Sequence, residues 1–171
     1  KCVGWMNGII IEINAQNKVG CVGFKSFLKT IEPLYGYFMK DVTILDEMSF
    51  EEKVQILNER AEVAYEELSR CWNLVFDKWD VLEERWISAN EENYQIYYNE
   101  DYYLQKTMGV VAVNKIIVNC YSNGDGYSTF VDIISKSALT VDDWRTNGKF
   151  AGLNSMSGAN QIEKTIREYT K

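Results

Sequence analysis

The chain of 171 residues contains no histidine, and this absence limits the chemistry that its side chains can perform. Without an imidazole there is no Ser-His-Asp triad, no Cys-His dyad and no histidine metal ligand. Acid–base catalysis by paired carboxylates remains chemically available. The acidic residues of the segment 49–88, however, lie among polar residues, which is typical of the solvated face of a helix. We therefore expect no catalytic residues and no enzyme activity.

Cysteine is the next residue type that could do chemistry, and the four cysteines are Cys2, Cys21, Cys71 and Cys120. An even count without a Cys-x-x-Cys pair favours two disulfides over a zinc site. Stable disulfides are typical of extracellular proteins, so we predict a secreted protein, with buried reduced thiols in a cytosolic protein as the alternative. Among the possible connectivities we favour Cys2–Cys21 and Cys71–Cys120, because each bridge would then join sequence-adjacent segments.

One loop has some of the features of a calcium site. The stretch NGDGYSTFVD resembles the second half of an EF-hand loop, with Asn123, Asp125 and Gly126 at matching positions. Tyr121 stands where the first aspartate of that loop belongs, and Asp132 replaces the bidentate glutamate. A glycine-rich turn is the favoured interpretation. We predict no metal site and no cofactor.

Four aromatic residues recur at seven-residue intervals: Tyr65, Trp72, Trp79 and Trp86. On an α-helix this spacing places them on one face, with about 20° of drift per step. Because tryptophan is highly buried on average, we interpret the line as a packing seam. The alternative is a groove wall for an apolar ligand or a partner's helix, in which Trp79 and Trp86 would contact the ligand.

A second aromatic group follows in the tyrosine-rich stretch YQIYYNEDYYLQ. Its members are Tyr94, Tyr97, Tyr98, Tyr102 and Tyr103. Tyrosine combines a large contact area with few side-chain torsions and a polar tip, and contact surfaces are rich in it for that reason. We therefore predict a ligand- or partner-binding surface here, although some of these side chains would face the core if the stretch is helical.

The elements that position these residues are predicted to be helices. The sequence SFEE, from Ser49 to Glu52, is a capping box that marks a helix start. The following apolar residues recur with a helical period, and no Pro or Gly interrupts the run, so we predict one long amphipathic helix over 49–88. Further helices are predicted over 2–17, 21–41, 106–121, 129–139 and 160–169. The many Val and Ile residues of 106–121 also suit a strand.

The predicted fold class is all-α: a disulfide-stabilised bundle of about five to seven helices around one long central helix. The length suits a single helical domain over residues 1–171. The formal net charge of −7 and the absence of a basic cluster argue against nucleic-acid binding. The longest apolar run, GIIIEI, is far shorter than the roughly 20 residues of a membrane span.

In style, this aromatic-rich, histidine-free chain with four cysteines resembles the fast-changing secreted proteins that arthropods deliver into hosts, such as mosquito salivary proteins. It is similar in particular to the aphid bicycle effectors, which carry paired Cys-Tyr-Cys motifs. Cys71-Trp72-Asn73 and Cys120-Tyr121-Ser122 hold the first cysteine and the aromatic residue of each motif, without the second cysteine. The resemblance implies a secreted, disulfide-bonded effector.

Together these features predict a secreted, non-enzymatic binding or effector protein that engages a host protein or a small apolar ligand through aromatic surface. One alternative is a structural protein that self-associates through its Trp and Tyr faces. A second alternative, an enzyme that uses carboxylates, has only the acidic residues in its favour.

Overall fold

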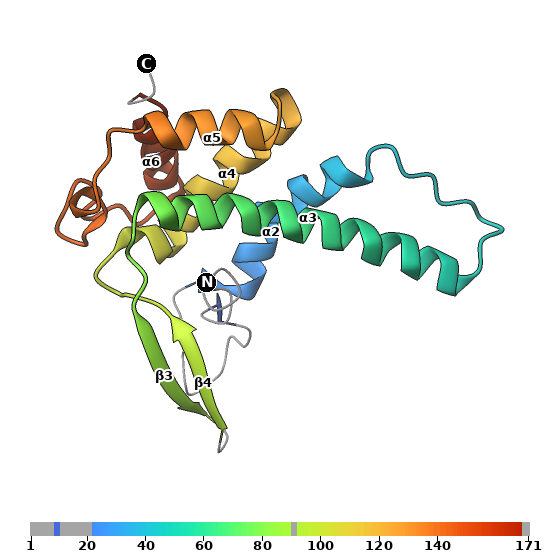
Figure 1. Ribbon diagram of the computed structural model, residues 1–171, viewed down its shortest axis with the longest axis horizontal. Helices are drawn as coiled ribbons and strands as arrows, with labels where there is room; N and C mark the ends of the chain where they lie inside the picture. The colour runs from blue at the N-terminus through green and yellow to red at the C-terminus, as the bar shows by residue number, and fades with distance from the viewer. Residues whose placement is uncertain (1–8, 11–21, 90–91, 169–171) are drawn as a thin grey trace.

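The computed structural model describes residues 9–10, 22–89 and 92–168, and this part of the chain is mostly helical (Figure 1). Its α-helices are α2 (Phe24–Met39), α3 (Phe50–Lys78), α4 (Thr107–Asn123), α5 (Tyr127–Lys136) and α6 (Met156–Glu168). Two short 3₁₀ helices, η1 (Tyr103–Gln105) and η2 (Asp142–Trp144), lie between them. The helical architecture confirms the predicted all-α class in its coarse form. None of the described helices is long and apolar enough to cross a membrane.

Four strands accompany the helices. The strands β3 (Glu84–Ala89) and β4 (Glu92–Tyr97) form an antiparallel hairpin that was not predicted. The two-residue strands β1 (Ile9–Ile10) and β2 (Val22–Gly23) pair in parallel. The helix predicted over 2–17 is therefore wrong at Ile9 and Ile10, and the rest of it lies outside the described residues.

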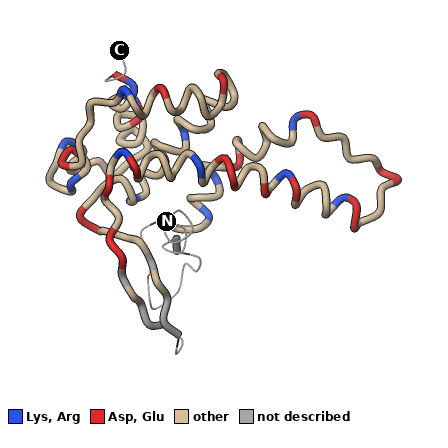
Figure 2. Tube along the Cα trace, viewed as in Figure 1, with Lys and Arg blue, Asp and Glu red and all other residues tan. Residues whose placement is uncertain are grey.

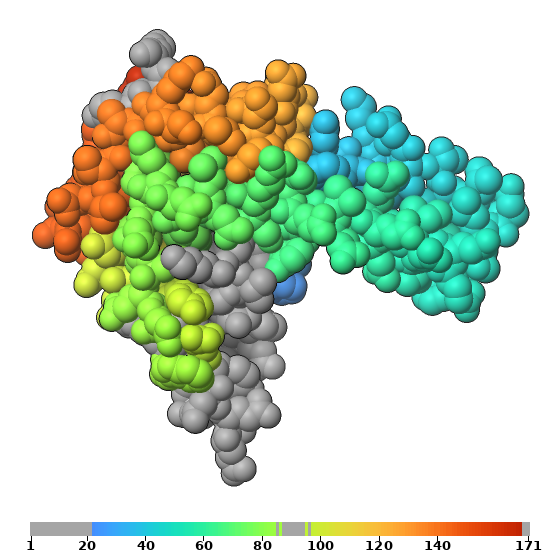
Figure 3. All heavy atoms as spheres, viewed as in Figure 1, coloured from blue at the N-terminus to red at the C-terminus, as the bar shows by residue number. Residues whose placement is uncertain are grey.

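The helices form a body with two projections (Figure 1). In the body, α4 packs against α2, α5 and α6, and the C-terminal half of α3 packs against α5. The C-terminal end of α2, the loop 40–49 and the N-terminal half of α3 extend from the body, and we call this segment the arm (Figure 3). Acidic residues outnumber basic residues along the arm (Figure 2). The β3–β4 hairpin is the second projection.

The start of α3 is fixed by local chemistry, as predicted. The Ser49 side chain accepts a hydrogen bond of 3.2 Å from the Glu52 amide, and the Glu52 carboxylate accepts one of 2.8 Å from the Ser49 amide. These bonds satisfy two amides that a helix start leaves without partners. The bond from the Ser49 amide also lowers the pKa of the Glu52 carboxyl.

The end of α3 differs from the prediction. The helix stops at Lys78, and Trp79 takes an extended conformation. Its indole N–H donates to the Leu139 carbonyl at 2.8 Å, and its ring meets Trp144 edge-on with a centroid distance of 5.0 Å. Trp86 then lies in β3, paired with Gln95. The prediction of one helix over 49–88 is wrong in its last part because these tertiary contacts turn the chain away.

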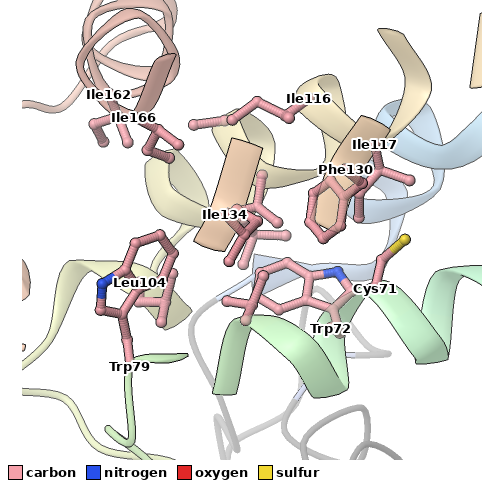
Figure 4. Close-up of a cluster of buried hydrophobic side chains, with 14 of the residues drawn as sticks. Cys71, Trp72, Trp79, Leu104, Ile116, Ile117, Phe130, Ile134, Ile162 and Ile166 are labelled. Atoms are coloured by element: carbon pink, nitrogen blue, oxygen red, sulfur yellow. The ribbon is translucent and has the colours of Figure 1, made fainter. Parts of the chain in front are cut away.

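The packing-seam interpretation of the aromatic line holds for its two central members. Trp72 and Trp79 are fully buried in a core shared by all five described helices, where Trp72 lies beside Phe130 and Ile134 of α5 (Figure 4). Tyr65 is 41% exposed and Trp86 is 65% exposed. The seam therefore ends where the arm begins on one side and where the hairpin begins on the other.

A chain of hydrogen bonds joins three helices inside the body, and its central residue, Asn114, is buried. The Trp72 indole N–H of α3 donates to the Asn114 side-chain oxygen of α4 at 2.9 Å. The Asn114 amide nitrogen donates to the Thr30 hydroxyl of α2 at 2.7 Å, and that hydroxyl donates to the Phe27 carbonyl at 2.6 Å. Asn114 is fully buried. Since buried polar groups cost free energy unless they are paired, this chain specifies how the three helices meet.

The predicted Cys71–Cys120 disulfide is absent: both residues are buried free thiols. The Cys71 thiol is hydrogen-bonded to the Tyr121 phenol, which itself donates to the Glu67 carboxylate. A disulfide needs closely approaching backbones, whereas α3 and α4 meet here through the long side chains of Tyr121 and Trp72. Cys2 and Cys21 lie outside the described residues, so their predicted bridge stays a prediction.

The other helix predictions are confirmed with small shifts of their bounds. Pro33 lies inside α2 and does not restart it. The valine- and isoleucine-rich segment forms α4, which is buried on most sides and therefore needs no polar face. The predicted glycine-rich loop is confined to residues 124–126, because α4 continues to Asn123 and α5 starts at Tyr127.

We expect the variant Asn114→Leu to lower the free energy of unfolding by about 2–4 kcal/mol, because it removes the side-chain oxygen that accepts the hydrogen bond of the buried Trp72 indole N–H. Urea denaturation measures this change. Asn73→Leu, at an exposed position of α3, is the matched control and should change stability by less than about 0.5 kcal/mol. Equal effects of the two substitutions would contradict the structural role of the hydrogen-bond chain.

We also expect Cys71 and Cys120 to resist alkylation by iodoacetamide at pH 8.5 in the folded protein. Burial raises the pKa of both thiols, that of Cys71 to about 12, and keeps them from the reagent. Peptide mass mapping should find both alkylated after unfolding in denaturant without reductant. Failure to alkylate the unfolded protein until reductant is added would show a disulfide and contradict this structure.

Candidate binding groove

The side chains of the predicted tyrosine surface that the structure describes are half-buried. Tyr97 and Tyr98 are half-buried at the base of the hairpin. The Tyr97 hydroxyl accepts a hydrogen bond from Gln95, and the Tyr97 carbonyl accepts one from the buried Gln105 at 2.8 Å. Tyr94 lies in β4, and its side chain is outside the description. The hydrogen bond between the Gln105 side chain and the Tyr97 backbone thus holds the base of the hairpin.

The other two tyrosines join loops to the body. Tyr102 forms a β-bridge with Arg145, whose guanidinium carbon lies 5.4 Å from the centre of the Tyr102 ring. The Tyr103 hydroxyl accepts a hydrogen bond of 3.0 Å from the Gly152 amide. Both rings are half-buried. These contacts are structural, and sequence spacing alone did not reveal them.

The two tryptophans predicted to contact a ligand have opposite environments. Trp79 is fully buried against Trp144 and offers no surface to a ligand. Trp86 is exposed on the hairpin, seven residues after Trp79 in the sequence. Among the predicted binding residues, Trp86 is therefore the one whose ring is mostly open to solvent in the described part of the chain.

A groove that the sequence did not predict lies between α2 and α3. Its cavity volume is about 590 Å³, within the usual range for small-molecule sites. Apolar side chains make up most of its wall, and the lining residues are Lys25, Phe27, Leu28, Lys29, Ile31, Glu32, Leu34, Tyr35, Ala61, Ala64, Tyr65 and Leu68. Phe27, Leu34 and Leu68 are buried and form its floor, while Leu28 remains 42% exposed at its edge.

Two features of the sequence open this groove. First, α2 carries apolar residues on two adjacent faces: Phe27 and Leu34 belong to the shared core, whereas Leu28 and Tyr35 reach the groove. Second, α3 presents the small residues Ala61 and Ala64 opposite them, which are too short to fill the space between the helices. This pairing of large residues with alanines was the available sequence signal.

The ends and rim of the groove differ in chemistry. Towards the arm, the Tyr35 hydroxyl donates a hydrogen bond of 3.4 Å to the Leu57 carbonyl and links the two helices. Lys25 and Lys29 lie on the rim at the N-terminal end of α2, and Glu32 follows one turn later. The groove therefore joins an apolar interior to a basic end.

A smaller and more polar groove lies on the other side of α2. It has a cavity volume of about 390 Å³ and runs between α2 and α4, with Met156 of α6 at one edge. Lys29, Thr30 and Lys115 contribute to its wall alongside Pro33 and Val111. Its mixed lining makes it a weaker candidate for an apolar ligand than the α2–α3 groove.

The arm itself carries exposed apolar residues. Phe50, the first residue of α3, is 77% exposed, and Ile44, Leu45 and Leu57 are also exposed. They lie around the arm tip rather than in the α2–α3 groove. An exposed apolar cluster of this kind is a second candidate contact surface.

No metal centre is evident in the described part of the chain. No group of three or more Cys, Asp or Glu side chains there could hold a metal ion. Asp132, at the last position of the calcium-like loop, instead pairs with Lys136 at 2.6 Å. Comparison of the chain with protein-family models, curated proteins and solved structures gives no match.

We expect iodide to quench Trp86 and to leave Trp72 and Trp79 unquenched, because only Trp86 of these three is exposed. The variant Trp86→Phe should therefore lower the iodide-accessible fraction of the tryptophan fluorescence. The conservative core variant Trp79→Phe, checked for folding by circular dichroism, is the control and should raise that fraction slightly. An unchanged accessible fraction in Trp86→Phe would show that the ring is covered in solution.

Proposed function

We propose that this protein is a non-enzymatic binding protein that takes the apolar part of a ligand into the α2–α3 groove. The observation that carries the proposal is a groove of about 590 Å³ with a predominantly apolar lining, open between helices that the core holds in place. Ligand-binding sites are commonly clefts between helices with a predominantly apolar lining. Tyr35 and Tyr65 on the groove wall supply the aromatic contacts to the ligand in this proposal.

Binding is favoured over catalysis by the chemistry of the same groove. Among the described residues that line the groove, Glu32 is the one acidic residue, so these residues offer no carboxylate pair for acid–base work. The sequence supplies no histidine that could replace such a pair. The groove is therefore suited to holding an apolar group and lacks the side chains that would transform it.

Self-association is the second candidate function, and the exposed Phe50 favours it. This side chain, together with Ile44 and Leu45, could meet the same surface of another copy. Sedimentation velocity over a hundredfold concentration range tests this candidate. A growing dimer fraction that the variant Phe50→Ser abolishes would support it, and a monomer at every concentration would exclude it.

Secretion and an effector role in a host stay predictions. The four cysteines motivated the extracellular location, yet Cys71 and Cys120 are free thiols in this structure. The support that remains is the composition: an acidic, aromatic-rich chain without histidine. The proposed binding activity does not depend on this location.

The proposed function is tested by filling the groove. We expect Ala61→Phe to weaken binding of the neutral apolar dye Nile red at least tenfold, or about 1.4 kcal/mol, because the new ring occupies the space that alanine leaves. Dye fluorescence titration measures the affinity, and circular dichroism checks that the variant folds.

Val63→Phe is the matched control for this experiment. Val63 is exposed on the same helix and does not line the groove, so this variant should bind the dye within twofold of the wild type. Equal binding by the wild type and the two variants would place the dye elsewhere and contradict the proposed site. Absence of dye binding by the wild type would contradict the proposed function.

A further inference from the structure

We propose that the α2–α3 groove binds a single-chain amphiphile with a carboxylate headgroup, of the fatty-acid class. The alkyl chain would lie along the groove, and the carboxylate would lie at Lys25 and Lys29. This inference rests on the proposed function, because it names the ligand class of the same groove. Its support comes from the shape of the groove, the chemistry of its walls and the charge at one end.

The shape suits a narrow, linear ligand. The lining residues of α2 run from Lys25 to Tyr35, which corresponds to a length of about 15 Å at 1.5 Å per residue. The groove follows α2 over this length and has a volume of about 590 Å³. An extended alkyl chain, which is narrow and linear, matches this shape.

The walls of the groove suit a ligand whose buried part has no polar groups. Between the basic rim and the arm, most of the lining is apolar and offers no hydrogen-bonding side chain, and Tyr65 adds one hydroxyl. The apolar lining residues are Leu28, Ile31, Ala61, Ala64 and Leu68. An extended peptide in this position would bury backbone N–H and C=O groups without partners, at a cost of several kcal/mol. An alkyl chain has no such groups, and each buried methylene contributes about 0.8 kcal/mol.

The charge at one end suits an anionic headgroup. Lys25 and Lys29 are four residues apart and therefore lie on the same side of α2. Neither forms an ion pair with another described residue.

The helix end adds to this preference. The first turn of α2 contains no acidic residue, and its N-cap, Gly23, has no side chain to cap it. The helix dipole thus reinforces the two ammonium groups.

Glu32 gives the ligand a direction. Its carboxylate lies on the rim about one turn beyond Lys29 and would repel an anion placed near the middle of the groove. The headgroup is therefore expected at the N-terminal end of α2 and the methyl end near Tyr35 and the arm. This basic end is a local exception in a chain whose formal net charge is −7.

The experiment compares decanoate with 1-decanol by isothermal titration calorimetry at pH 8, below the concentration at which either aggregates. The double variant Lys25→Gln/Lys29→Gln should weaken decanoate binding about tenfold, the effect of losing two partly exposed ion pairs, and should change decanol binding less than twofold. Raising the salt to 1 M should weaken decanoate binding to the wild type, because salt screens the ion pairs with the two lysines. It should leave decanoate binding to the double variant unchanged.

Lys40→Gln is the matched control, since Lys40 lies exposed at the far end of α2 and does not line the groove. It should leave both affinities unchanged. Decanoate binding that is equal in the wild type and the double variant would overturn the headgroup assignment. If decanoate binds both proteins equally but Ala61→Phe abolishes decanol binding, the proposed function of the groove is supported and only the headgroup assignment is overturned. If neither ligand binds the wild type, both the inference and the proposed function are overturned.

Discussion

The hydrogen-bond chain from Trp72 through Asn114 to Thr30 is the constraint on which the arrangement of α2 and α3 depends. It fixes both helices to α4, which is buried on most sides at the centre of the body. Because α2 is held to α4 at Thr30, this hydrogen bond helps to set the position of α2 beside the alanines of α3, where the groove lies. A purely apolar contact would specify this geometry less strictly, since it is not directional.

The core around this chain explains why the aromatic line divides into two parts. Trp72 packs on Phe76 with a centroid distance of 5.4 Å, and Trp79 packs on Trp144, which in turn contacts Phe150 at 4.9 Å. These clusters stabilise the body at the C-terminal half of α3. At the arm the same helix has fewer neighbours, so Tyr65 remains partly exposed and lines the groove. One helix thus contributes both the core and the candidate site.

A local signal in the sequence correctly predicted the start of α3. The capping box at Ser49 needs only neighbouring residues, and its prediction is confirmed. The end of α3 could not be predicted in this way, because no Gly or Pro marks it and a contact with the distant Leu139 carbonyl draws Trp79 out of the helix. The hairpin had a weak signal, the alternation of polar and apolar residues from Asn93 to Ile96, which the expected helices obscured.

The candidate site was harder to predict than the fold. A sequence pattern shows that Leu28 and Ile31 are apolar, but it does not show whether the facing helix fills the space beside them. That depends on Ala61 and Ala64, more than thirty residues later, and on the position of α2 set by Asn114. Conversely, the tyrosines that composition predicted as a surface are mostly used to join loops. A binding site formed between helices is a tertiary property.

The most direct test of the account is a methyl NMR titration of the protein with decanoate. The account predicts intermolecular nuclear Overhauser effects from the alkyl chain to the methyl groups of Leu28, Ile31 and Leu68, and none to Ile162 in the buried core. Contacts confined to methyl groups outside the groove, or no contacts at saturating decanoate, would contradict it.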